Sequence, residues 1–305
     1  MKPIRGVNVV LSQDSDGDKM FLINNEVIDN ISNNKNIAVG LFPQSRLVNY
    51  DTIKTYSFDA LLNYALDKKM PLVGIIEWPY YNSEKANAYE VPVEVVDKVI
   101  SAGGIPVGIF PTQVCSFQQT RLSDMPELLP CEKKDLEDVL SFMDGVIKPG
   151  AFKAYEFDKY IHSYTVANNM PYFGICAGMQ IMTYPEGKLV NTNPNDDVAD
   201  VELHSAHNGY AHDIIIAHDT RLYDILKKDR IMVNSKHKKC IPRKSLENFI
   251  ISAEADDKTV EAIEIADKAF QIGVQWHPEL LDDEYTDKIF GSFIEESKTY
   301  SLYRK

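Results

Sequence analysis

One segment in the middle of the chain, residues 170–183, constrains the fold more than any other. It reads M-P-Y-F-G-I-C-A-G-M-Q-I-M-T, with strand-forming residues before Cys176 and helix-forming residues after it. A nucleophile at such a sharp turn needs small neighbours, and Gly174 and Gly178 provide them. The first N–H groups of the helix would favour the thiolate and could bind an oxyanion. The segment alone fits either a catalytic cysteine or a small packed one.

A second segment favours the catalytic interpretation. Residues 270–279 read F-Q-I-G-V-Q-W-H-P-E, a strand pattern that leads directly into His277 and Glu279. A cysteine nucleophile needs an imidazole base, and the imidazole needs a carboxylate that orients it. We therefore predict a triad in which Cys176 is the nucleophile, His277 the base and Glu279 the orienting group.

Strand-like and helix-like segments alternate along most of the chain. Short apolar runs of the kind found in strands buried on both faces occupy residues 37–42, 72–76, 105–110 and 145–148. Stripes with helical spacing occupy residues 56–70, 89–102, 133–142 and 285–300. This alternation predicts an α/β fold with a doubly wound, mostly parallel sheet flanked by helices. Cys176 would form a nucleophile elbow at the carboxyl end of a central strand, where open sheets bind their ligands.

Charge and cysteine usage exclude several classes of protein. The formal net charge of −13 would repel phosphates, so we expect neither nucleic acid nor an anionic membrane as a partner. The four cysteines at 115, 131, 176 and 240 show no C-x-x-C spacing, which indicates neither a disulfide framework nor a zinc ribbon. No apolar run approaches the length of a signal core or a membrane span. We expect a cytoplasmic protein.

Four histidines lie close together in the sequence, at positions 204, 207, 212 and 218. None is paired at i, i+4 on an evident helix with a nearby carboxylate, which is the usual signature of a helical metal site. Solvated or hydrogen-bonding histidines are the commoner outcome. We therefore predict no metal and no organic cofactor.

The order of several motifs resembles the class I glutamine amidotransferase-like superfamily. G-I-C-A-G-M-Q is followed about a hundred residues later by G-V-Q-W-H-P-E, as in that superfamily. Five further motifs resemble its γ-glutamyl-γ-aminobutyrate hydrolase-like branch: P-L-V-G-I-I (71–76), A-G-G-I-P-V (102–107), D-G-V-I-K-P-G (144–150), V-N-S-K-H (233–237) and V-E-A-I-E (260–264). The resemblance implies a catalytic domain over residues 71–305. Residues 1–70 would be an extension of unknown role that packs on this core.

The resemblance also implies which residues surround the nucleophile. Backbone N–H groups of Ala177 and Ala151 would form the oxyanion hole. Ala177 replaces an arginine that is common in this branch, and Ala151 replaces a second glycine. The implied oxyanion-hole and substrate-binding residues are Ala177, Gly150, Ala151, Gln180, Ser235 and His237.

The resemblance implies a hydrolase that cleaves γ-glutamyl amide bonds of small molecules through a thioester. One alternative is a glutaminase subunit that delivers ammonia to a partner synthetase. Another is an inactive binding module, which the complete triad disfavours. A homodimer is possible, and the leaving amine of the substrate stays open.

Overall fold

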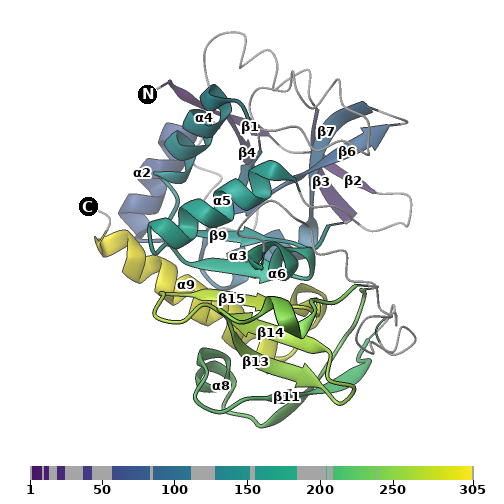
Figure 1. Cartoon of the computed structure of the whole chain (residues 1–305). Coiled ribbons are helices and arrows are strands. Elements are labelled where there is room, and N and C mark those ends of the chain that lie inside the picture. The colour runs from purple at the N-terminus through teal and green to yellow at the C-terminus, as the bar shows by residue number, and fades with distance from the viewer. Residues whose placement is uncertain are drawn as a thin grey trace.

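The computed structural model describes residues 2–8, 10–13, 19–24, 37–42, 57–82, 85–110, 128–151, 155–183, 204, 209–237 and 239–303. Among the residues singled out above, Cys115 and His207 lie outside these ranges. Within them the strands form an eleven-stranded sheet and a separate four-stranded sheet (Figure 1). The fold is α/β, with helices flanking the large sheet, as the sequence predicts.

The centre of the large sheet is parallel. It contains, in spatial order, β8 (Ile105–Ile109), β5 (Leu72–Ile76), β9 (Gly145–Lys148), β10 (Tyr172–Ile175) and β15 (Gln271–Val274). Neighbouring strands in this group all pair in parallel. Since parallel strands end at the same edge, the residues after β9, β10 and β15 meet there. These are the turn at Gly150, Cys176 and His277.

Alternating side chains of the central strands form two apolar layers, one on each face. Val73, Ile75 and Phe173 pack against α3 (Val93–Ser101) and α9 (Glu284–Tyr303). Leu72, Ile76 and Tyr172 face the opposite layer. That layer includes α2 (Phe58–Lys68), α4 (Pro130–Leu140), α5 (Glu156–Ala167) and α6 (Ala177–Met182). Both faces are therefore covered, which explains why these strands read as continuous apolar runs.

The sheet becomes antiparallel on the side beyond β15. The strands there are β14 (Val260–Glu264), β13 (Ile250–Ala255), β11 (His212–Ile216) and β12 (Arg230–Val233). Each pairs antiparallel with its neighbour. The short helix α8 (Arg221–Leu226) packs against α9 near this flank (Figure 1).

The opposite edge is built by the first part of the chain. β4 (Ile37–Leu41) pairs antiparallel with β8 and parallel with β1 (Ile4–Asn8), which is the outermost strand. The helix α2 begins after Ser57, whose side chain accepts a hydrogen bond from the Ala60 N–H at 3.1 Å. It ends at Lys69 in a left-handed conformation and buries Phe58, Leu61 and Ala65.

The four-stranded sheet corrects one sequence prediction. We predicted a helix over residues 89–102, but the helix α3 begins only at Val93. The preceding residues form β7 (Lys85–Pro92), in which Tyr89 and Val91 pair with β3 (Lys19–Asn24). β2 (Val10–Gln13) and β6 (Trp78–Asn82) complete this antiparallel sheet. Tyr89 and Val91 are buried two residues apart, which is strand spacing rather than helical spacing.

Among the described residues, no helix is both long enough and apolar enough to cross a bilayer.

Candidate active site

Cys176 lies at the turn from β10 into α6 and has an unusual backbone conformation. Its φ is +51° and its ψ is −105°, a combination that costs a non-glycine residue on the order of 1–3 kcal/mol. The surrounding hydrogen bonds enforce it: the Cys176 N–H donates to Val274 O at 2.7 Å, and the Gln180 N–H donates to Cys176 O at 3.1 Å. The thiol is thereby held at the amino end of α6.

The flanking glycines are required by the close approach of neighbouring backbone. A Cβ on Gly174 would lie 2.6 Å from the carbonyl carbon and oxygen of Gly178. A Cβ on Gly178 would overlap the carbonyl oxygen of Lys148 on β9. The G-x-C-x-G pattern is therefore explained by packing at this strand-to-helix turn.

His277 follows β15 closely and is held on two sides. Its Nδ1 lies 2.7 Å from Oε1 of Glu279, which is buried. Its backbone is clamped by Asn234, which accepts from the His277 N–H at 2.9 Å and donates to its carbonyl oxygen at 2.7 Å. The carboxylate on Nδ1 leaves Nε2 as the ring nitrogen available to the thiol, as a base in a triad requires.

The electrostatics favour a thiolate–imidazolium pair. Burial alone would raise the pKa of the Cys176 thiol, but the charge and hydrogen bond of His277, together with the charge of His237, lower that pKa below its ordinary value. Burial would lower the pKa of His277, but Glu279 and Cys176 raise it to about 10. The two groups titrate as a pair, and both pKa shifts favour its charged form.

The turn after β9 lies directly against these two side chains. A Cβ on Gly150 would be 3.3 Å from the Cys176 Cβ and 2.6 Å from Cε1 of His277. Ala151 follows immediately and is partly exposed, whereas Ala177 is buried at the first position of α6. The structure thus brings together the backbone segments to which we assign the oxyanion hole.

Gln180 contacts the site through a residue that the sequence analysis did not single out. The Gln180 side-chain amide donates to Gln275 Oε1 at 3.1 Å and to Lys239 O at 3.1 Å. Gln275 in turn donates to Cys176 Sγ at 3.5 Å. Its position two residues before His277, in the segment that follows β15, was the signal that could have identified it.

Ser235 and His237 lie in a buried cluster next to the triad. Ser235 is fully buried, and its hydroxyl donates to His204 O at 2.9 Å. His237 Nε2 is 3.5 Å from Oε1 of Glu261. The charge of His237 also helps to lower the pKa of Cys176. Asn234, in the same motif, is the residue that contacts His277, and the sequence analysis did not assign it to the site.

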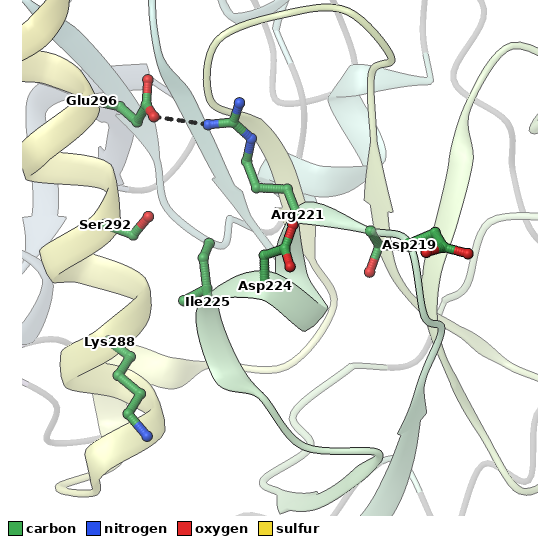
Figure 2. Close-up of a pocket in the computed structure, with 8 residues that line it drawn as sticks. Asp219, Arg221, Asp224, Ile225, Lys288, Ser292 and Glu296 are labelled. Carbon is green, nitrogen blue, oxygen red and sulfur yellow. Dashed lines mark hydrogen bonds and ion pairs between the residues drawn. The ribbon is translucent and has the colours of Figure 1, made fainter.

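A surface pocket elsewhere does not belong to this site. It lies between α8 and α9, where Arg221 forms a 3.0 Å ion pair with Glu296 (Figure 2). Asp219, Asp224, Lys288 and Ser292 also line it, and no triad residue does.

The fold and the cysteine elbow place the chain among the class I glutamine amidotransferase-like proteins. The glutaminase domain of Trypanosoma brucei CTP synthase, solved with bound acivicin, superposes with a TM-score of 0.53 over 75% of this chain and 94% of that domain, at 16% identity. Residues 71–279 match the Peptidase C26 family. The protein belongs to this family, which includes γ-glutamyl hydrolases.

Individual relatives agree with this assignment. A glutamine amidotransferase-like protein of Rickettsia prowazekii is 26% identical over 300 residues, which cover 76% of this chain and 99% of the relative. A CTP synthase of a Hydrogenobaculum species is 28% identical over 200 residues, which cover 56% of this chain and 37% of that enzyme. The protein is a C26-type, glutamine amidotransferase-like hydrolase.

Proposed function

We propose that the protein hydrolyses γ-glutamyl amide bonds of small molecules, with Cys176 as nucleophile. The observation that supports this most strongly is the arrangement of three groups in one place. A cysteine with a lowered pKa occupies a strained elbow, beside a histidine whose Nδ1 is 2.7 Å from a buried carboxylate. Membership in a family that includes γ-glutamyl hydrolases supports the γ-glutamyl group as the acyl part of the substrate.

Acylation begins with attack of the Cys176 thiolate on the amide carbonyl carbon. The carbon–sulfur bond forms, and the carbonyl oxygen becomes an oxyanion that the N–H groups of Ala177 and Ala151 stabilise. When the carbon–nitrogen bond breaks, the His277 imidazolium donates its Nε2 proton to the leaving amine. A γ-glutamyl thioester on Cys176 and a neutral His277 remain.

Deacylation uses the same groups in the reverse roles. Neutral His277 accepts a proton from water as the water oxygen attacks the thioester carbonyl carbon. Collapse of the second tetrahedral intermediate expels the thiolate and releases glutamate, with the proton retained on His277. Glu279 stabilises the imidazolium in both half-reactions, and each cycle restores the charged pair.

The experiment compares γ-glutamyl and α-glutamyl anilides, γ-glutamyl amines and glutamine as substrates of the purified chain. We expect release of the aromatic amine from the γ-linked anilide and its loss in Cys176→Ala. Cys131→Ala is the matched control, because Cys131 is an exposed cysteine on α4. Turnover of the α-linked anilide alone, or undiminished turnover by Cys176→Ala, would contradict the proposal.

A second candidate is a glutaminase that supplies ammonia to a synthetase. It is favoured by the similarity to the CTP synthase and to the glutaminase domain described above. The two candidates differ in their dependence on a partner. A free-standing hydrolase turns over γ-glutamyl amines alone, whereas a glutaminase subunit would prefer glutamine and accelerate when its synthetase is added.

A further inference from the structure

Three histidines converge on one buried carboxylate oxygen, Oε1 of Glu261 on β14. The distances to it are 3.4 Å from His204 Nδ1, 3.7 Å from His212 Nε2 and 3.5 Å from His237 Nε2. Glu261 is fully buried, and the three histidines are each at least nine-tenths buried. The ring of His204 lies 4.6 Å from that of His212 and 4.8 Å from that of His237, measured between centroids.

The other nitrogen of each ring already has an oxygen partner. His204 Nε2 lies 3.0 Å from Asp257 Oδ2, His212 Nδ1 lies 3.2 Å from Asp213 O, and His237 Nδ1 lies 3.0 Å from Lys239 O. Carbonyl and carboxylate oxygens accept hydrogen bonds, so these outer nitrogens donate. In a neutral imidazole the inner nitrogen then carries a lone pair. Three such lone pairs and a carboxylate oxygen therefore face one another.

This arrangement is unfavourable unless a cation lies among the four atoms. Among the described residues, no group hydrogen-bonds to either oxygen of Glu261, to His212 Nε2 or to His237 Nε2. The Ser235 hydroxyl has a single proton, which it donates to His204 O at 2.9 Å. A buried carboxylate without a compensating charge is costly, and lone pairs directed at it increase that cost. Glu261 raises the pKa of His237, so a proton on His237 balances the carboxylate when no metal is bound. A divalent metal would replace that proton and serve all four donors.

The three nitrogen–oxygen distances match the spacing between neighbouring ligands of a tetrahedral ion. Ligand atoms about 2.0–2.1 Å from a zinc ion stand about 3.4 Å apart at the corners of a tetrahedron. The three histidine nitrogens lie 3.4–3.7 Å from Glu261 Oε1. Donor atoms of His204, His212 and Glu261 all lie within 4.8 Å of one another. Imidazole nitrogens with one carboxylate oxygen suit zinc, and an oxygen partner on the second nitrogen of each ligating histidine is the usual outer support of such sites.

We propose that a zinc ion binds His204, His212 and Glu261, and that His237, which adjoins Glu261 Oε1, completes the site as the fourth ligand. Four protein ligands close the coordination sphere, so the ion has a structural role rather than a catalytic one. It joins β11, β14 and the segment after β12 on the antiparallel flank of the sheet (Figure 1). That segment contains Asn234, whose side chain holds the backbone of His277. The site therefore stabilises the flank and helps to position the base.

The test measures zinc in the full chain. Protein is stripped with a chelator, returned to equimolar zinc at neutral pH and dialysed, and its metal content and melting temperature are measured. We expect about one zinc per chain and a higher melting temperature with zinc, since a ligand that binds the folded state stabilises it. Cys176→Ala should bind equally well, which separates this site from the catalytic thiol. His218→Gln is the matched control, because this histidine is exposed and pairs with Asp229.

His212→Gln and Glu261→Gln should each bind zinc at least about 100-fold more weakly and lose the zinc-dependent rise in melting temperature. If these variants fail to fold, Asp257→Asn leaves all four ligands in place, removes the charge of the outer partner of His204 and should weaken binding about 10- to 100-fold. Cobalt in the wild-type chain should give a tetrahedral visible spectrum that Cys176→Ala preserves. The proposal is wrong if the wild-type chain retains no zinc, if Cys176→Ala abolishes binding, or if neither His212→Gln nor Asp257→Asn weakens it.

Discussion

The molecule contains two buried histidine–carboxylate arrangements, and they are built differently. The pair His277 and Glu279 is separated by a single residue in the sequence and lies at the end of the parallel centre of the sheet. The cluster around Glu261 draws its histidines from separate segments on the antiparallel flank. The first has a partly exposed thiol beside it, whereas the second has only buried donors. We infer that openness to substrate distinguishes the catalytic arrangement from the structural one.

The two arrangements also differ in what balances the negative charge of the buried carboxylate. At the triad, a proton shared within the thiol–imidazole pair balances Glu279, and the pKa of His277 rises to about 10. At the cluster, three imidazoles face one carboxylate, and the zinc ion that we propose balances it. Asn234 and the segment up to His237 connect the two regions. The following predictions separate their roles.

The largest effect is expected from removing the nucleophile or the base. Cys176→Ala and His277→Ala should each reduce kcat by a factor that in a comparable triad reaches on the order of a million. The measurement is γ-glutamyl anilide hydrolysis, with His218→Ala as the matched control for the histidine. Zinc content should be unchanged in both variants. Substantial activity in Cys176→Ala would show that the triad assignment is wrong.

Glu279→Gln should have the next largest effect. Loss of the carboxylate in a serine protease triad lowers kcat on the order of ten-thousand-fold. The alkaline limb of the pH–kcat/KM profile should also move, because His277 must hold its proton to donate it to the leaving amine. Glu279 and Cys176 together raise the pKa of His277 to about 10, so removal of Glu279 shifts this limb to lower pH. The control is Glu284→Gln, which changes an exposed carboxylate on α9. An alkaline limb that does not move in Glu279→Gln would mean that Glu279 does not act on His277.

Asn234→Ala tests the connection between the two regions. The substitution removes both hydrogen bonds to the His277 backbone, and a small displacement of a catalytic group costs up to about 100-fold. We expect kcat to fall roughly tenfold to 100-fold with KM little changed and zinc retained. Asn168→Ala, at the exposed end of α5, is the control. Equal losses in the two variants would show a general effect on stability instead of positioning.

The smallest expected effect is a difference in thiol reactivity. Because the pKa of Cys176 is lowered, iodoacetamide at mildly acidic pH should modify it about ten times faster than Cys131 or Cys240. The advantage should shrink in His277→Ala, which lacks the charge that lowers this pKa. Peptide mapping gives the order of modification. Faster modification of Cys131 or Cys240 would show that His277 does not activate Cys176.

The sequence predicted the elements whose determinants are local. The elbow at Cys176 is encoded by two glycines and a change from strand-forming to helix-forming residues within a few positions. The central strands were recognisable because burial on both faces makes them continuously apolar. His277 and Glu279 were singled out because a strand pattern leads directly into them and an imidazole base needs a carboxylate to orient it.

The sequence analysis missed features that depend on how distant segments pair in the sheet. The four-stranded sheet was not predicted, since Tyr89 and Val91 run directly into the helical stripe of α3 and only their pairing with β3 reveals a strand. The cluster around Glu261 was missed because its histidines have no helical spacing. β11 and β14 become close only when β13 pairs with both of them. Asn234 was missed for the same reason, because its contact with His277 joins segments 43 residues apart.

The central claim, that hydrolysis proceeds through Cys176, is tested most directly by trapping the acyl-enzyme. The wild-type chain is mixed with a γ-glutamyl anilide, quenched in acid during turnover and digested for peptide mass mapping. The account predicts a glutamyl adduct on the peptide that contains Cys176, which disappears when the substrate is exhausted and is absent from Cys176→Ala. Steady release of the amine without an adduct on any cysteine, or with an adduct on a different cysteine, would contradict it.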